Sequence, residues 1–342
     1  LLHGPRHRIL DHCLNQTASN LVTFSSLARY NRGMLRMLAV AVNTFREAVR
    51  DRVLHGVLGI ALSLLLFTLA LAELALDQQR RIVLDVGLSS ISLFSVIMSV
   101  FLGSSLLYKE IERKTLYVIL PKPIRRHEFL LGKYFGIVLT VSVFVLLMGS
   151  VQICVSSFQL AGPNAWLVSA IPLLLVLLGV AMYFARDRTA VLVPWSAAAL
   201  LVTSVIGWRL GVALWPILAQ LLLTMGEVLV LCAVALLFSA FSTPFLTALF
   251  TTGVWLVGRS ADLMAQTKSK LLPELVKSLL QKLVRVWPNF NLFVPGRHTL
   301  GAKLDDLAGP ASYVLSSMTY AALYSALLLT FAAFIFRKRD FL

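Results

Sequence analysis

Residues 212–240 read VALWPILAQLLLTMGEVLVLCAVALLFSA, and Glu227 is the only charged residue among them. A helix needs about 20 predominantly apolar residues to cross the roughly 30 Å of a bilayer's hydrocarbon core, and this run is long enough. Because no water reaches backbone polar groups there, only helices or closed barrels span a membrane, and the run lacks the alternation of barrel strands. The stretch therefore predicts a transmembrane helix.

The rest of the chain has the same character. Hydrophobic residues make up 58% of its 342 residues and charged residues 14%, whereas soluble domains carry about 25% charged residues. Similar apolar runs predict spans at 57–76, 86–107, 130–155, 166–185, 189–208, 212–240, 244–258 and 312–336. We expect an all-α, polytopic transmembrane bundle of six core spans with an inserted pair at 166–208. Residues 34–342 form this one domain, and the polar residues 1–33 are expected to be a leader, with the natural start at Met34 or Met37.

The formal net charge of +15 comes from Lys and Arg residues that lie mostly in loops and beside the predicted spans. Cytoplasmic loops hold the excess of such residues in membrane proteins, so the loops 109–133 and 186–188 and the tail 337–339 are assigned to the cytoplasm. Both termini are then cytoplasmic. A nucleic-acid partner would need a basic face on a soluble module, so we expect none.

Two segments outside the spans have amphipathic spacing. In residues 38–55 one helical face is apolar, opposite Arg46, Glu47, Arg50 and Asp51; its residues are Leu38, Val42, Phe45, Val49 and Val53. This pattern predicts a helix in the membrane interface, with a cytosolic helix packed on protein as the alternative. A second amphipathic helix, over 272–286, is expected within an external segment at 259–311, although the Lys and Arg residues of that segment run against the positive-inside rule.

A charged island at 108–133, YKEIERKTLYVILPKPIRRHEFLLGK, separates two strong spans. Lys109 to Leu120 has the spacing of a short helix, and Pro121 and Pro123 end it before the chain re-enters the membrane. A charged helix and turn at the membrane face predict a docking surface.

Particular residues of this island match a known pattern. They are Glu110, Glu112, Thr115, Leu120-Pro121, Pro123, Arg125 and Gly132-Lys133, preceded by Phe45-Arg46-Glu47 and Arg50. In these residues the chain resembles the membrane subunits of the ABC-2-type exporter permease superfamily. The ending Arg337-Lys338-Arg339-Asp340-Phe341 is similar to that of its nitrous-oxide-reductase-maturation branch. Lys114 stands where many members have Gly, and the pair at 166–208 exceeds their usual six spans.

This resemblance implies an interfacial connector helix at 38–55 and a cytosolic coupling helix within 109–126. It implies that a cytosolic ABC ATPase docks on the coupling helix, through Glu110, Glu112, Arg113, Thr115 and Leu116. It also implies a second permease copy or a related permease, contact with membrane lipids, and a role as an exporter in the bacterial inner membrane.

The sequence contains no motif for catalysis of its own. It lacks G-x-x-x-x-G-K-[ST], HExxH, a nucleophile elbow and any clustered set of His and carboxylate residues, and Cys13, Cys154 and Cys232 are isolated. We therefore expect that the chain is not an enzyme and holds no cofactor or metal, and that a partner subunit binds and hydrolyses ATP.

Polar residues inside the predicted spans are the remaining candidates. Gln220, Thr224 and Glu227 recur at helical spacing and so share one face. An intramembrane carboxylate is costly, which favours a functional role; a protonated or hydrogen-bonded structural Glu is the alternative. Two stripes of small residues predict close helix packing: Ser92, Ser95, Ser99 and Gly103, and Thr243, Thr247 and Thr251.

Two other functions stay open. An ion-gradient-driven secondary transporter would use Glu227, but such transporters usually carry an internal repeat, and none is visible in this sequence. A non-transporting membrane assembly factor is the other alternative.

Overall fold

The computed structural model describes residues 33–74, 78–112, 126–161, 191–266, 287–294 and 310–338, with a few positions between 173 and 189. These residues are mostly helical and include no β-strand, which confirms the all-α class. The elements are α2 (Arg52–Leu74), α3 (Gln79–Glu112), α5 (Arg126–Ala161), α7 (Leu192–Arg209), α8 (Leu214–Ser239), α9 (Pro244–Gln266), the 3-10 helix η1 (Phe290–Phe293) and α12 (Pro310–Lys338). A further helix, which we call the N-terminal helix, covers residues 33–49.

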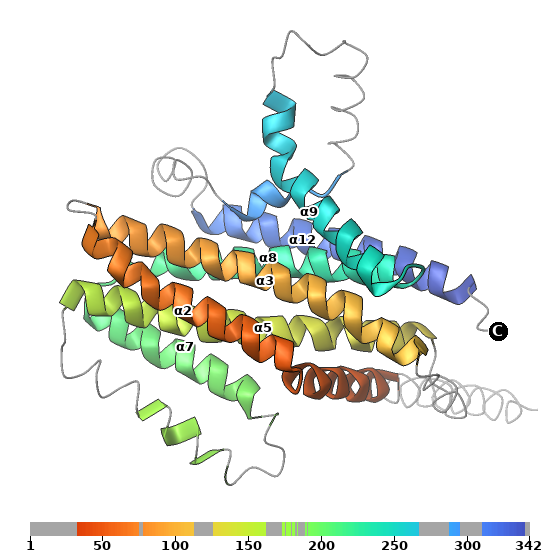
Figure 1. Ribbon diagram of the computed structural model, residues 1–342, viewed down its shortest axis with the longest axis horizontal. Helices are drawn as coiled ribbons and strands as arrows, with labels where there is room; N and C mark the ends of the chain where they lie inside the picture. Colours follow the sequence, from red (N-terminus) through yellow and green to blue (C-terminus); the bar gives the residue numbers. More distant parts are fainter. Residues whose placement is uncertain are drawn as a thin grey trace, which may run out of the picture.

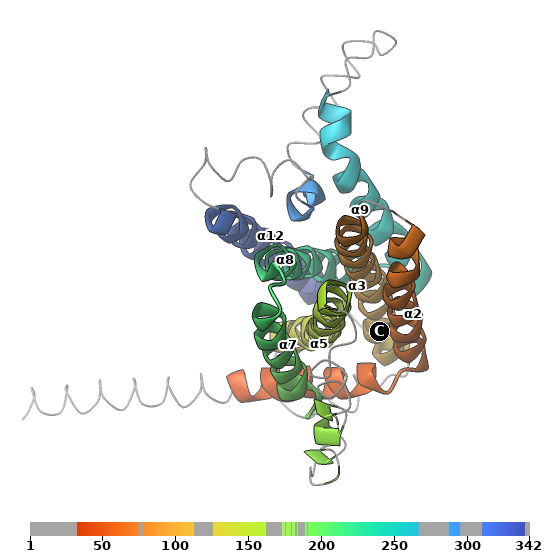
Figure 2. The same cartoon turned by 90° about the vertical axis from the view of Figure 1, so that its left-hand side faces the viewer.

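The helices form one elongated bundle around α8 (Figures 1 and 2). α8 packs against α3, α5 and α12, and 72% of its apolar window is buried, compared with 22% for α2, α7 and α12. Six of the described helices, α2, α3, α5, α7, α8 and α12, are long and apolar enough to cross a membrane. A buried central helix ringed by helices with apolar outer faces is the arrangement expected of a polytopic membrane protein.

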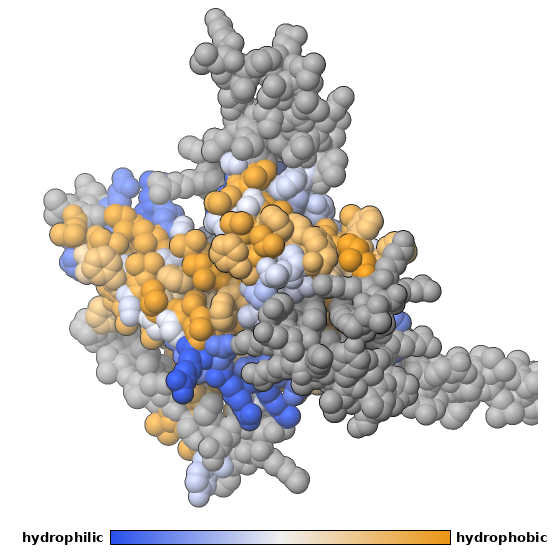
Figure 3. Space-filling model, turned by 45° about the vertical axis from the view of Figure 1, so that its right-hand side comes forward, coloured by the Kyte–Doolittle hydropathy of each residue, from blue (hydrophilic) through white to orange (hydrophobic). Residues whose placement is uncertain are grey.

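The outer surface agrees with a lipid environment. Large hydrophobic side chains such as Phe67, Leu201 and Leu323 are exposed on α2, α7 and α12. Figure 3 shows hydrophobic residues over much of the bundle's visible face, with hydrophilic residues gathered in separate patches. Exposed apolar patches of this extent have no counterpart on soluble monomers.

Local sequence signals explain where several helices begin and end. α7 ends at Arg209, and the cap that follows includes Gly211, whose φ of +80° suits glycine; Val212 N–H bonds the carbonyl of Gly207 at 2.9 Å, a Schellman arrangement. α9 and α12 each begin with proline, Pro244 and Pro310, where the missing N–H costs nothing.

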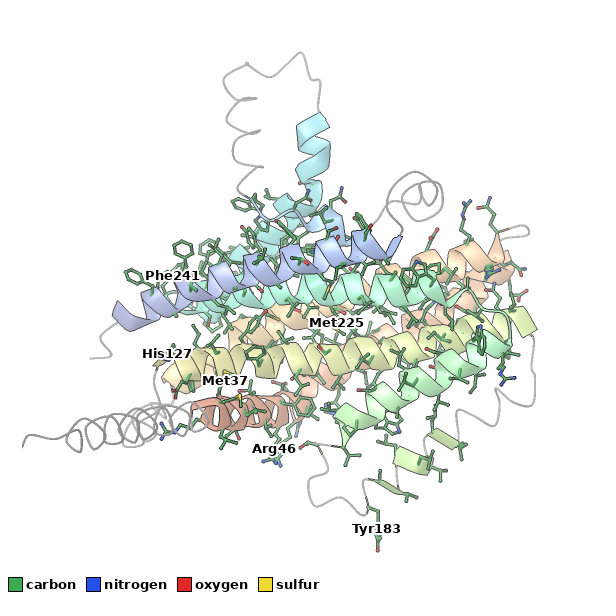
Figure 4. The ribbon with its side chains drawn as sticks, turned by 180° about the vertical axis from the view of Figure 1, so that it is seen from behind. Met37, Arg46, His127, Tyr183, Met225 and Phe241 are labelled. Atoms are coloured by element: carbon green, nitrogen blue, oxygen red, sulfur yellow. The ribbon has the colours of Figure 1, made fainter. Side chains whose placement is uncertain are left out.

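The N-terminal helix crosses the underside of the bundle and packs on the first turns of α5 (Figure 2). A Cβ placed on Gly132 would lie 2.8 Å from the Met37 carbonyl, and one on Gly136 would lie 2.7 Å from the Ala41 carbonyl. In Figure 4, Met37 lies on the side of its helix that faces α5. The two glycines of α5, spaced by four, therefore let the two backbones approach closely.

This packing corrects the predicted connector helix at 38–55. The N-terminal helix ends at Val49, and α2 starts at Arg52 after Asp51, whose carboxylate accepts the Val53 N–H at 3.0 Å. The buried face consists of Ala41, Thr44, Phe45 and Ala48, whereas Leu38 is exposed. Val40 and Thr44 are the side chains that meet Gly132 and Gly136, and Phe45 is buried as well, so part of the predicted apolar face is buried and part is exposed.

The predicted spans coincide with helices at seven positions, six of which are long and apolar enough to cross a membrane, and the differences lie at their ends. The span expected at 86–107 is part of a longer α3, so Lys109 to Glu112 continue that helix instead of starting a separate one. The span expected at 244–258 is part of α9, which continues to Gln266. The span at 166–185 falls mostly outside the described residues, as do the leader and the amphipathic helix at 272–286.

One end of the bundle gathers the segments assigned to the cytoplasm. The end of α3, the start of α5 and the end of α12 lie together at the right of Figure 1. His127, in the first turn of α5, and Phe241, just after α8, occupy this same end in Figure 4. The turn between α7 and α8 lies at the opposite end. We call the end that holds the end of α3, the start of α5 and the end of α12 the coupling end.

Candidate functional site

Glu227 lies near the middle of the 26-residue α8 and is completely buried. Three side chains donate hydrogen bonds to its carboxylate: Ser92 to Oε2 at 2.8 Å, Trp255 to Oε1 at 2.8 Å, and Arg259 to Oε1 at 3.1 Å. Arg259 also forms an ion pair with it. We call these four residues the Glu227 cluster.

Three helices supply the cluster. Ser92 belongs to α3 and Glu227 to α8, while Trp255 and Arg259 follow each other at i and i+4 on one face of α9. The Arg259 guanidinium also lies over the Trp255 ring, 5.7 Å from its centre. The carboxylate thus joins α9 to the α3–α8 pair in the interior of the bundle.

The cluster has the chemistry that a buried membrane carboxylate requires. A charge in the bilayer interior costs several kcal/mol unless it is paired and hydrogen-bonded. Glu227 has both kinds of partner, but the pair is asymmetric: the Glu227 side chain is 0% exposed and that of Arg259 31%. The carboxylate is therefore fixed in place, whereas the guanidinium keeps an open side.

The other two residues of the predicted polar face contact a different part of the molecule. The Gln220 amide donates to the carbonyl of Phe293 at 3.1 Å, and the Thr224 hydroxyl donates to the carbonyl of Gln220 at 2.9 Å. All three predicted residues are buried on α8, as expected. Gln220 and Thr224, however, donate their hydrogen bonds to these carbonyls and not to Glu227.

Gln220 contacts a short segment, residues 287–294, that inserts between α8, α9 and α12. Phe290 and Phe293 are fully buried there, and a Cβ on Gly226 would lie 2.7 Å from the Phe293 ring. Hydrogen bonds hold the segment: Trp287 donates to the Val254 carbonyl and Tyr313 to the Leu292 carbonyl. Part of the region predicted to be external is therefore buried inside the bundle.

The structure also describes the first residues of that region, which continue α9 to Gln266. Arg259 was assigned to the external segment, yet it lies within α9 and pairs with Glu227. Its charge is therefore paired with a buried carboxylate and is not that of a loop residue.

The stripes of small residues are mainly packing positions. A Cβ on Gly103 would lie 2.4 Å from the Ala235 Cβ, so α3 and α8 are in close contact there. Ser95 and Ser99 donate to carbonyls one turn earlier in α3. Ser92 is the exception, because it donates to Glu227.

The predicted ATPase contacts are only partly described. Glu110 and Glu112 lie in the last turn of α3, whereas Arg113, Thr115 and Leu116 fall outside the described residues. Lys133, counted with the cytoplasmic loop, is instead fully buried in α5, with its ammonium 5.6 Å from the centre of the Phe129 ring. The N-terminal helix packs on this part of α5, which explains the burial.

No group of three or more His, Cys, Asp or Glu side chains that could hold a metal ion occurs among the described residues. Cys154 and Cys232 are free thiols within α5 and α8.

Sequence reasoning missed Arg259 and Trp255. The signal was present: α9 carries an arginine one turn after a tryptophan, at the end of an apolar run that contains no other charge. An intramembrane arginine calls for a carboxylate partner, and Glu227 is the only carboxylate in the preceding span.

Neither a protein-family model nor a curated protein matches the sequence of this chain.

Proposed function

We propose that the chain is the transmembrane permease subunit of an ATP-binding cassette exporter in a bacterial inner membrane. A separate cytosolic ATPase would dock at the coupling end and supply the energy, and a second permease copy or a related permease would complete the pathway. Three features support this proposal: the bundle of membrane-length helices, the N-terminal helix lying across it, and the charged sequence between α3 and α5.

One observation supports the proposal most strongly: α3 and α5 are both unbroken helices that run from the coupling end into the core. α3 runs unbroken from Ser92, at the Glu227 cluster, to Glu112 at the coupling end. α5 begins at Arg126 and within two turns packs on the N-terminal helix through Gly132 and Gly136. A displacement of the adjacent ends of α3 and α5 would therefore move both the N-terminal helix and the hydrogen-bonding partners of Glu227.

This arrangement gives a physical route for coupling. ATP binding would close two ATPase subunits beneath the coupling end, and α3 and α5 would transmit the movement as rigid rods. α9 is attached to α3 and α8 through the Glu227 cluster, so its position would follow. The two positions of α9 would be the two states whose populations ATP shifts.

The test uses the chain reconstituted in vesicles with the ATPase encoded beside it. Reversing two charges at the coupling end, Glu110→Lys with Glu112→Lys, should abolish the stimulation of ATPase activity by the chain while membrane insertion stays normal. A matched control reverses Glu73, at the far end of α2, to Lys. Full stimulation by the double variant would contradict the docking assignment.

Glu227 also favours a second candidate, a transporter driven by a proton or ion gradient. The same vesicles separate the two: export should continue when the proton gradient is collapsed and ATP is supplied, and Glu227→Gln should still export. Export that stops on collapse, or a Gln variant without any export, would favour the gradient-driven transporter.

A further inference from the structure

Arg259 has hydrogen-bonding capacity that the described residues leave unused. A guanidinium carries five N–H donors in a planar fork. Among the described residues only NH1 has an acceptor, Oε1 of Glu227. The remaining donors lie on a side chain that is 31% exposed, in contrast to the completely buried carboxylate.

The surface around this open edge is apolar. One face of α9 leads from the coupling end toward Arg259 and exposes Phe245, Leu249 and Leu256. The last turns of α9 project away from the bundle in both Figure 1 and Figure 2, and the Arg259 side chain is 31% exposed. An anion that reaches the guanidinium along α9 would therefore have an apolar tail beside hydrophobic side chains.

We propose that the open edge of the Arg259 guanidinium, beside Trp255 and Leu256, binds the oxyanion headgroup of an amphiphile, a phosphate or a carboxylate. The guanidinium fork matches the geometry of both anions and bonds them with two parallel N–H donors. The Trp255 indole and the exposed apolar face of α9 contact the apolar part of the ligand. Binding goes beyond the exporter proposal and needs no ATPase, so either proposal can fail alone.

Glu227 sets the strength of this site. Its carboxylate partly neutralises Arg259 at 3.1 Å and repels a second anion. Ser92 and Trp255 also bind the carboxylate, so Glu227 keeps two hydrogen bonds when Arg259 turns toward a ligand. Removing the charge of Glu227 should therefore strengthen anion binding, whereas removing that of Arg259 should abolish it. If the ion pair were purely structural, removing either charge would change anion binding in the same direction.

The experiment titrates the purified chain in neutral detergent with three lipid probes and counts bound lipids by native mass spectrometry. The probes are phosphatidic acid, oleate, and phosphatidylcholine as the zwitterionic reference. We expect the first two to bind more tightly than the third. Arg259→Gln should weaken their binding roughly tenfold or more, as expected for loss of a charge-assisted bidentate contact. Glu227→Gln should bind them more tightly than the parent chain.

Arg209 provides the matched control, because its guanidinium lies over the Trp208 ring at 5.9 Å at the exposed end of α7. Arg209→Gln should leave the preference for anionic lipids intact. Unchanged binding by Arg259→Gln, weaker binding by Glu227→Gln, or no preference for either anionic lipid would overturn the proposal. Millimolar inorganic phosphate should not displace the lipids; displacement would identify a water-soluble anion as the ligand and overturn the assignment to an amphiphile.

Discussion

At the residue scale, the Glu227 cluster is the most demanding feature of the molecule. A single carboxylate at the middle of α8 takes donors from α3 and α9, and each donor removes part of the cost of burying it. Some members of the cluster could be recognised from the sequence and others could not. Glu227 stands out in an apolar run, whereas Ser92 looks like one more small packing residue among several.

Replacing Glu227 should reveal the ion pair in the thermal stability of the purified chain. Glu227→Leu leaves Arg259 without its partner, at a cost of about 3 kcal/mol, the lower end of the range for buried pairs, because Arg259 is 31% exposed. Glu227→Gln keeps the volume and acceptors for Trp255 and Arg259, so it should lose much less. The double variant with Arg259→Leu should regain part of the stability lost by Glu227→Leu. Equal melting of the Gln and Leu variants would contradict the role of the pair.

At the element scale, contact between the N-terminal helix and α5 depends on glycine. Gly132 and Gly136 lie where a side chain would meet the backbone of the partner helix. Gly56 and Gly59 of α2 have nothing within 4 Å of an added Cβ. The sequence does not separate these two pairs of helical glycines; only the packing shows that Gly132 and Gly136 lie at a helix contact and that Gly56 and Gly59 do not.

Alanine substitutions in these two pairs should change the stability of the protein in opposite directions. Gly136→Ala should destabilise the protein by about 1–3 kcal/mol, as overpacking does, and loosen the N-terminal helix. Gly59→Ala should stabilise it slightly, by roughly 0.5–1 kcal/mol, because alanine loses less backbone entropy in a helix. Thermal melting measures both, and proteolysis after residue 50 reports release of the N-terminal helix. A stabilising Gly136→Ala would show that the two helices do not pack as described.

At the scale of the whole molecule, the bundle has two distinct ends. The coupling end holds the end of α3, the start of α5 and the end of α12, while the turn between α7 and α8 lies at the other (Figure 1). The basic residues beside α5 and at the end of α12 predict that the coupling end faces the cytoplasm.

Reporter fusions test this assignment. Alkaline phosphatase fused after Lys338 should be inactive, because the enzyme needs the periplasm, whereas fusion after Gly211 should be active. Green fluorescent protein at the same two positions should give the reverse pattern. Phosphatase activity at Lys338 would mean that the bundle is inserted the other way round.

The sequence by itself determined that the chain is a bundle of membrane helices, because apolar runs of sufficient length have no other soluble or membrane fold available. It also identified Gln220, Thr224 and Glu227 as buried on one face, since helical spacing alone places them there. Only the tertiary structure decided what they bind. Arg259 reaches Glu227 and Phe293 reaches Gln220 from residues 32 and 73 positions away, and periodicity along one helix carries no information about such distant partners. The same holds for the N-terminal helix: its pattern predicted an apolar face, but the contacts of Val40 and Thr44 with Gly132 and Gly136 involve a distant helix that the pattern does not specify.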